Sequence, residues 1–163
     1  MNTPPTASID PRILHAIPHR PPMLLVDRIL ELEDDSIICE KTFRDNEYFF
    51  DGHFPDHPIV PGVILCECAA QAGAVLLFST LANRNDSTPD VNDNSTVAGI
   101  PMLTRMSDIK FKQQVRPNDT ISVQCGLVER VSTAYMMKAQ VRRQSKLVAS
   151  LEFVCVVQPV SKS

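Results

Sequence analysis

A run of sixteen residues, Gly52 to Glu67, contains side chains that could transfer protons. His53 lies between a glycine and a Phe-Pro pair in a stretch rich in proline. Prolines restrict the backbone and therefore the direction of the imidazole. Histidine is the side chain best suited to accepting a proton near neutral pH, so His53 is a candidate general base. A hydrogen-bonded structural histidine is the alternative, and His57 is a minor rival for the same role.

Glu67 is the second candidate, because it interrupts a long apolar run from Val63 to Leu81. A lone buried carboxylate is costly unless it is paired or protonated. Burial favours the protonated form of a carboxyl group, which suits a general acid. Gln71 follows four residues later on the same helical face and could donate a hydrogen bond to Glu67. A structural glutamate, paired across an interface or lying at the solvent edge of the helix, is the alternative.

Gly62 supplies a third part of the candidate site. Pro61 is expected to open the helix, which leaves Gly62 in the first turn, where backbone N–H groups have no intrahelical partner. The helix dipole favours negative charge there, so the Gly62 N–H is a candidate oxyanion donor. A base, an acid and an oxyanion donor together indicate proton abstraction next to a carbonyl group.

Several elements are expected to position these residues. Asp10-Pro11 is predicted to open a short helix over Arg12–Ala16, and Pro61 a long helix reaching about Leu81. Met23–Leu32 and Ser36–Phe43 are predicted to be strands. Period-two alternation predicts four more, each with one face buried and one wet: around Ile109 to Val115, Ile121–Leu127, Tyr135–Val141 and Leu147–Val157. We expect residues 1–163 to form one domain, with a loose tail over 1–10 and a mobile loop over 82–96.

The fold class that follows is α+β, with an antiparallel sheet of about six strands wrapped around one central helix. The apolar run is near membrane-spanning length, but it contains Glu67 and Gln71. A buried core helix is therefore predicted rather than a membrane span.

Composition narrows the function further. The net charge of -3 argues weakly against a nucleic-acid binder, yet the halves differ: residues 1–96 hold 6 Lys/Arg and 15 Asp/Glu, and residues 97–163 hold 10 and 4. This asymmetry indicates either a basic surface for an acidic partner or simply exposed strand faces. The five cysteines show neither zinc spacing nor a CxxC motif, so we expect no metal site and a reduced, cytoplasmic protein.

Four separated motifs resemble the FabZ-type 3-hydroxyacyl-acyl carrier protein dehydratases. They occur in the family's order between about residues 12 and 158, which makes the resemblance specific. The motifs are Ile17-Pro18-His19-Arg20-Pro21-Pro22, then Leu24–Arg28, then Gly52 through Gln71, and finally Phe111-Lys112 with Val115–Asp119. This chain has Asp56-His57 where the family commonly has Gly and a variable residue, and Asn118 where a turn Gly is usual.

The resemblance implies a hot-dog fold whose active site forms at a homodimer interface, with the dimers often assembled as a trimer. It implies His53 as base, Glu67 as acid, Gly62 as backbone donor to the thioester carbonyl, and no cofactor. Relatives with added isomerase activity carry Asp in place of Glu67, so dehydration alone is expected. The implied partner is an acidic acyl carrier protein. Candidate residues for docking it are Lys110, Lys112, Arg116, Arg142 and Arg143.

Two alternatives remain at this point. A hot-dog thioesterase would share the fold and the acyl substrates, and would use a carboxylate to direct water at the carbonyl. A non-catalytic acyl-binding homologue would keep the two side chains while its tunnel is closed.

Overall fold

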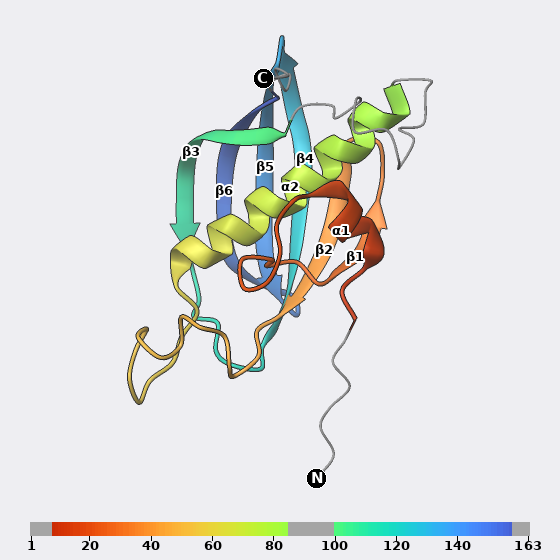
Figure 1. Ribbon diagram of the computed structural model, residues 1–163. Helices are drawn as coiled ribbons and strands as arrows, with labels where there is room; N and C mark the ends of the chain where they lie inside the picture. The colour runs from red at the N-terminus through yellow and green to blue at the C-terminus, as the bar shows by residue number, and fades with distance from the viewer. Residues whose placement is uncertain (1–7, 85–99, 158–163) are drawn as a thin grey trace, which may run out of the picture.

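The computed structural model describes residues 8–84 and 100–157 (Figure 1). Its six strands form one antiparallel sheet in the order β1-β2-β4-β5-β6-β3, and the longer of its two helices lies across one face. The elements are α1 (Pro11–Ala16), β1 (Arg28–Leu32), β2 (Ser36–Thr42), α2 (Gly62–Arg84), β3 (Pro101–Phe111), β4 (Thr120–Val131), β5 (Ala134–Arg143) and β6 (Lys146–Val157). The predicted α+β hot-dog arrangement is confirmed.

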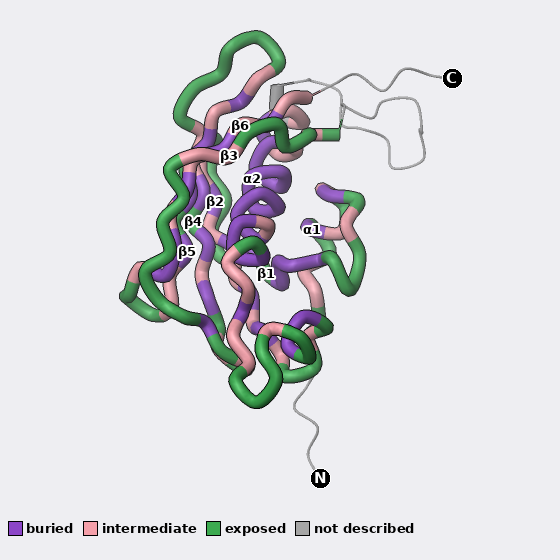
Figure 2. The backbone as a smooth tube through the Cα atoms, turned by 90° about the vertical axis from the view of Figure 1, so that its left-hand side faces the viewer, coloured by how far each residue is buried: buried purple, intermediate pink, exposed green. Residues whose placement is uncertain are grey.

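Helix α2 forms the centre of the core, as its nearly uniform apolar character predicts. Figure 2 shows it buried between the curved sheet and the segment that contains α1. The span Gly62–Ala82 has a mean hydropathy of 1.7, which by length and composition would allow it to cross a membrane. However, 72% of its most apolar stretch is buried inside the protein. The sheet approaches closely at Gly73, where an added Cβ would lie 2.8 Å from the Phe153 ring. The helix is therefore a core helix, as predicted.

The first predicted strand is too long, because Met23–Asp27 is not part of the sheet. The first part of this segment bonds instead to a side chain of α2: the Leu25 N–H donates to Gln71 Oε1 (2.8 Å) and the Met23 carbonyl accepts from Gln71 Nε2 (2.7 Å). The backbone of Asp27 bonds to β2 only through its N–H, which donates to the Glu40 carbonyl (2.8 Å). Leu24, Leu25 and Val26 are nevertheless buried. Their apolar character reflects packing against the core rather than sheet pairing.

Strand β3 also differs from the expectation. It begins at Pro101, well before the predicted residues, and its ladder with β6 is interrupted twice by register shifts. Ile109 is 40% exposed and Phe111 is 52% exposed in the single chain, although the alternating pattern predicted a buried face. Since β3 is an edge strand of the sheet, its outer backbone and these apolar side chains are uncovered.

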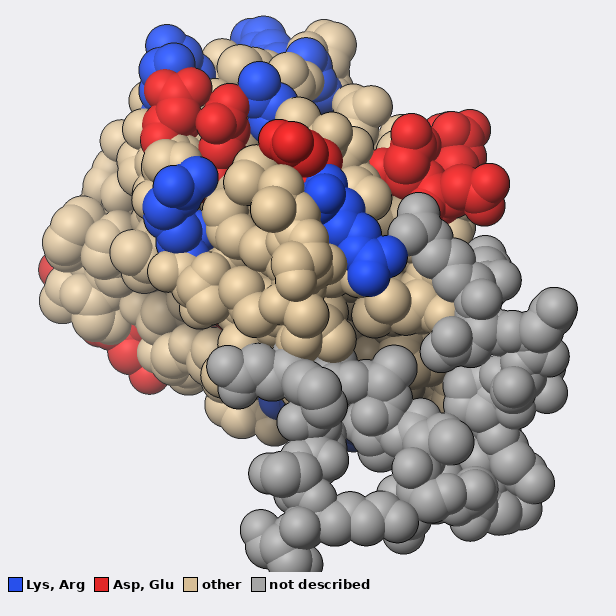
Figure 3. Space-filling view, turned by 90° about the horizontal axis from the view of Figure 1, so that it is seen from above, with Lys and Arg blue, Asp and Glu red and all other residues tan. Residues whose placement is uncertain are grey.

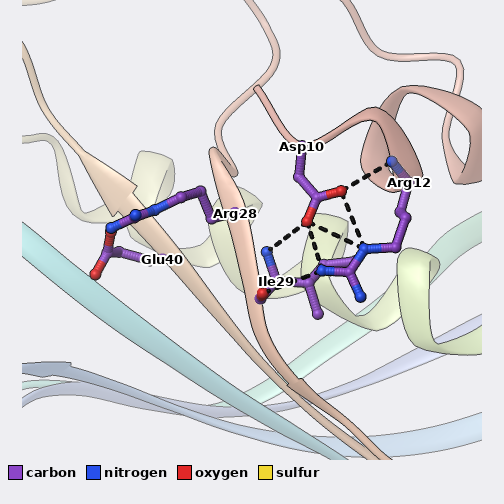
Figure 4. A network of polar contacts seen from close by, with 5 residues as sticks. All are labelled: Asp10, Arg12, Arg28, Ile29 and Glu40. Carbon is purple, nitrogen blue, oxygen red and sulfur yellow. Dashed lines mark hydrogen bonds and ion pairs between the residues drawn. The ribbon is translucent and has the colours of Figure 1, made fainter. Parts of the chain in front are cut away.

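Asp10 belongs to the folded part of the chain, so the expected loose tail does not extend to residue 10. Its carboxylate caps α1 by accepting from the Arg12 N–H (2.9 Å) and pairs with the Arg12 guanidinium (2.6 Å), as Figure 4 shows. The hydrogen bond from the Arg12 side chain lowers the pKa of Asp10. Nearby, Arg28 pairs with Glu40 across β1 and β2.

The loop predicted over residues 82–96 begins later than expected. Residues 82–84 continue α2, and residues 85–99 lie outside the described residues.

Lys41 is a buried charge that the sequence pattern did not predict. Its ammonium group lies 3.0 Å from Glu47 Oε1 and 3.4 Å from Asp27 Oδ1, and its side chain is 4% exposed. Asp27 also accepts from the Thr42 N–H at 2.9 Å. The three charged side chains join β2, the segment before β1, and the loop that leads to His53.

Candidate active site

His53 lies in the loop between β2 and α2, and the backbone of this loop is held by its own hydrogen bonds. The His53 N–H donates to the Phe49 carbonyl (3.0 Å), and the His53 carbonyl accepts from the Ile59 N–H (3.0 Å). The Val60 N–H then donates to the Val115 carbonyl (2.8 Å), which attaches the loop to the segment after β3. The proline-rich loop is therefore an ordered platform for the imidazole.

The imidazole itself is fixed by the carbonyl of Ile59, which lies 2.9 Å from His53 Nδ1. A carbonyl oxygen can only accept a hydrogen bond, so Nδ1 must carry the hydrogen. In the neutral ring this leaves Nε2 with a free lone pair, which is the state that a general base needs. The Phe54 ring stacks on the imidazole, with the ring centroids 4.2 Å apart.

His57 occupies a turn beside this loop. The His57 N–H donates to the Phe54 carbonyl (3.1 Å), and Asp56 at the third position of the turn has φ 61°. A positive φ at that position is one that glycine adopts freely, as the family resemblance led us to expect, and Asp is among the residues that tolerate it. The His57 side chain is exposed, and among the described residues no hydrogen bond orients it. The structure therefore favours His53 over His57 as an oriented imidazole.

Glu67 lies in the second turn of α2, partly exposed, with its side chain 27% accessible. Gln71, one helical turn later, donates from Nε2 to Glu67 Oε1 at 2.8 Å. The expected pairing of these two side chains is thus confirmed. His19, from the segment after α1, places Nε2 3.5 Å from the same carboxylate oxygen. This third partner could not be predicted from residue spacing, since His19 is 48 residues away from Glu67.

Gly62 is the first residue of α2, so its N–H lies at the positive end of the helix dipole. None of the hydrogen bonds found among the described residues uses this N–H. The Phe111 ring packs directly on the glycine: an added Cβ would lie 2.8 Å from Phe111 Cζ. A side chain here would collide with Phe111, so the close packing of this ring requires glycine at position 62.

His53 and Glu67 do not contact each other within one chain: each has the separate partners described above, and no hydrogen bond or ion pair between them is found among the described residues. Gly62 lies between them in sequence, at the end of α2 that the His53 loop joins (Figure 1). The chain therefore presents the His53 imidazole and the Glu67 carboxylate as two separately oriented groups near the start of α2.

Comparison with known proteins gives the family. Residues 17–152 match the family described as the FabA-like domain. The chain is 38% identical over 142 residues to 3-hydroxyacyl-[acyl-carrier-protein] dehydratase FabZ of Streptococcus pyogenes serotype M3, which covers 86% of this chain and 93% of that protein. The chain belongs to the FabA-like family.

Solved structures with low sequence identity share the fold of this FabA-like chain. The dehydratase heterocomplex ApeI:P from Xenorhabdus doucetiae matches with a TM-score of 0.70 and 14% identity, covering 90% of this chain and 91% of that chain. A hypothetical thioesterase with coenzyme A from Streptococcus pneumoniae TIGR4 matches with a TM-score of 0.58 and 12% identity, covering 80% and 84%. These matches support the hot-dog fold and say nothing about the reaction.

Cysteine chemistry is disfavoured at this FabA-like site. Cys66 and Cys68 flank Glu67, but both are buried free thiols, and burial raises the pKa of each. A thiol with a raised pKa is mostly protonated near neutral pH and is a poor nucleophile or metal ligand. Among the described residues there is also no group of three or more His, Cys, Asp or Glu side chains arranged to hold a metal ion.

The basic residues expected to dock a partner separate into two groups. Lys110 pairs with Asp108 (2.8 Å), Arg143 pairs with Asp119 (2.6 Å), and Arg142 donates to the Ser145 carbonyl (3.0 Å). Lys112 and Arg116 are exposed, and neither has an ion-pair partner among the residues described. Both lie in the segment after β3, which also contacts the His53 loop through Val115.

Two other surfaces of this FabA-like chain lack candidate catalytic residues. A groove of about 400 Å³ on the outer face of the sheet is lined by polar side chains of β4, β5 and β6, including Gln124, Gln140 and Ser150. The end of the molecule opposite the His53 loop shows Lys/Arg and Asp/Glu side chains interspersed (Figure 3). The end of the molecule that contains the His53 loop is therefore a better candidate than either surface for binding an acyl thioester or an acidic carrier.

Proposed function

We propose that this chain dehydrates 3-hydroxyacyl thioesters of acyl carrier protein to trans-2-enoyl thioesters in fatty-acid or related lipid biosynthesis. Membership of the FabA-like family and 38% identity to a FabZ dehydratase support the reaction class. The observation that carries the assignment of roles is the orientation of His53: the Ile59 carbonyl holds Nδ1–H and leaves Nε2 as the free proton acceptor.

The proposed reaction moves only protons and one water. The thioester carbonyl accepts a hydrogen bond from the Gly62 N–H, which stabilises the negative charge that develops there. His53 Nε2 removes a proton from the α-carbon. The C–O bond at the β-carbon breaks as Glu67 gives its proton to the leaving hydroxyl, directly or through a water. A carbon–carbon double bond and one water are formed, and no metal or organic cofactor is required.

The active unit that we propose is a homodimer in which His53 and Glu67 come from opposite subunits. Two observations support a second copy: His53 and Glu67 have no contact within one chain, and the edge strand β3 exposes Leu103, Ile109 and Phe111. Long apolar edge strands are normally covered, since their unpaired backbone groups invite pairing with another strand. Pairing β3 with its copy would cover this edge by a two-fold contact. Three such dimers would form the expected trimer of dimers.

Acyl carrier protein is the proposed partner, and the cytoplasm is the proposed location. The five buried free cysteines are compatible with a reducing compartment. Lys112 and Arg116 are the strongest docking candidates, because they are exposed, lie next to the His53 loop, and their charged groups form no ion pair among the described residues. Lys110, Arg142 and Arg143 are weaker candidates, since each is already engaged by neighbouring groups.

Reversing the charge at Lys112 or Arg116 should raise KM for the acyl carrier substrate about three- to tenfold, with kcat nearly unchanged, because encounter with an acidic partner weakens. The effect should shrink at high salt. Lys138→Glu is the matched control, since it makes the same charge change on the outer face of the sheet, where Lys138 pairs with Glu152. Steady-state kinetics with a carrier-bound substrate measures these values. An unchanged KM in both variants would rule out this docking surface.

The reaction itself is tested by giving the purified protein a 3-hydroxybutyryl thioester of acyl carrier protein. A dehydratase produces enoyl absorbance without free thiol, whereas a hot-dog thioesterase releases free thiol. A non-catalytic acyl-binding homologue does neither. Release of thiol without enoyl product, or no turnover with bound substrate, would refute the proposed reaction.

A further inference from the structure

His19 is a titratable side chain that the proposed mechanism does not use, yet it lies against the carboxylate of Glu67. Its Nε2 is 3.5 Å from Glu67 Oε1, and its side chain is 32% exposed. His19 belongs to the turn between α1 and Met23, which passes over α2. The chain thus brings a second imidazole, besides His53, to the proposed active site.

The backbone around His19 is held rigidly by Arg20. The Arg20 guanidinium donates to three carbonyls of this segment: Leu14 (3.0 Å), Ile17 (2.9 Å) and His19 itself (2.7 Å). The bonds to Leu14 and Ile17 satisfy carbonyls at the end of the short helix α1. The backbone that carries His19 is therefore fixed by hydrogen bonds within its own segment.

The amide of Gln71 fixes the same carboxylate from the other side, and its orientation is unambiguous. Its oxygen accepts from the Leu25 N–H (2.8 Å), so the other amide atom must be the nitrogen. That nitrogen donates its two hydrogens to the Met23 carbonyl (2.7 Å) and to Glu67 Oε1 (2.8 Å). One lone pair of Glu67 Oε1 therefore accepts from an amide whose orientation is fixed by its other two hydrogen bonds.

The protonation of His19 follows from its other ring nitrogen. Nδ1 is buried and has no hydrogen-bond partner in the described part of the chain. A hydrogen on Nδ1 would be a buried donor without a partner, which is costly. A neutral ring avoids this cost by keeping its single hydrogen on Nε2, which faces Glu67 Oε1. The Nε2–H of His19 is thus the group that faces that oxygen, at a distance longer than an ordinary hydrogen bond.

We propose that His19 is a positioning residue for the acid of the reaction. Together with Gln71 it occupies both lone pairs of Glu67 Oε1, so that the proton to be transferred resides on Oε2. The 3.5 Å contact is longer than an ordinary hydrogen bond, and it tightens when the acyl group fills the site, as catalytic contacts in unliganded enzymes commonly do. This inference rests on the proposed dehydration. It adds a geometric rule: only one oxygen of Glu67 delivers the proton to the leaving hydroxyl.

The test compares His19→Leu with His19→Gln in the dehydration assay. The leucine variant removes the donor, and the glutamine variant restores an N–H near the position of Nε2. We expect kcat of His19→Leu to fall about ten- to a hundredfold with KM within about twofold, as for loss of one hydrogen bond to a carboxylate whose charge develops as it gives up its proton. His19→Gln should recover most of the rate. Thermal unfolding of both variants shows whether they remain folded.

The double variant with Glu67→Gln separates a positioning role from a general structural one. Because His19 acts through Glu67, His19→Leu should cause no further loss of kcat when Glu67 is already replaced. Wild-type rates in His19→Leu, an equal loss in both backgrounds, or no recovery in His19→Gln would overturn the inference. A wild-type rate in Glu67→Gln alone would instead overturn the proposed role of Glu67, so the two failures are distinguishable.

Discussion

Replacing His53 by alanine should lower kcat for dehydration of a 3-hydroxybutyryl carrier thioester by about 10²–10⁴-fold, and Glu67→Gln should cause a loss of the same order. Each change removes one of the two proton-transfer groups while the fold remains. His53→Asn is the sharper variant, because its amide N–H can still donate to the Ile59 carbonyl that holds Nδ1. It keeps the loop in place without supplying a base, so it should be as inactive as alanine. Enoyl absorbance measures the rate.

His57→Ala is the matched control, since it removes the neighbouring imidazole, which is exposed and unoriented. It should retain most of the wild-type rate. A wild-type rate in His53→Asn, or a loss in His57→Ala equal to that in His53→Ala, would mean that His53 is not the base.

Mixing the two inactive variants also tests the dimer. If the base and the acid come from opposite subunits, a heterodimer of His53→Ala and Glu67→Gln contains one intact and one doubly altered site. Co-expressed variants that pair at random should then recover about a quarter of the wild-type activity. No recovery would show that both groups of one site belong to the same subunit.

Replacing Lys41 by methionine should lower the free energy of unfolding by about 3–5 kcal/mol. This is the largest effect on stability that we expect from a single substitution. Methionine keeps the length of the side chain but leaves the buried Asp27 and the partly buried Glu47 carboxylates without their cation. Because Glu47 lies in the loop that leads to His53, the rate of dehydration should fall as well. Chemical denaturation at a fixed protomer concentration measures the change.

Two variants control this experiment. Lys138→Met breaks an ion pair of similar length, 2.9 Å to Glu152, but both partners are exposed, so stability should barely change. The triple variant Lys41→Met, Asp27→Asn, Glu47→Gln removes the carboxylate charges together with the cation and should recover most of the stability. Equal effects of Lys41→Met and Lys138→Met would show that burial of this network is energetically unimportant.

Local patterns in the sequence predicted most of the elements. Asp10-Pro11 predicted α1, the apolar run predicted α2, and alternation predicted β4, β5 and β6. Asn118, expected in place of a turn glycine, has φ 67°, the left-handed conformation that Asn tolerates. These features were predictable because capping, turn chemistry and periodicity depend on residues within a few positions of each other.

The candidate site was predictable in its residue types but not in its connections. The pairing of Glu67 with Gln71 followed from helical spacing, which is a local relation. Local spacing did not predict the contact of His19 with Glu67. It also did not predict that the Ile59 carbonyl orients His53, since both contacts depend on how a loop packs. Strand β3 was predicted too short, because its register shifts and its uncovered edge give it no regular alternation of burial.

The sequence by itself determined the elements, the apolar core helix and the identity of the base and acid candidates, since these depend on side-chain type and short spacing. Only the tertiary structure decided that Met23–Asp27 leaves the sheet, because Gln71 on a distant helix supplies its hydrogen-bond partners. It likewise decided that Lys41 is buried with two acids. Hydrogen bonds and ion pairs form wherever packing brings complementary groups together, however far apart the two residues are in the sequence.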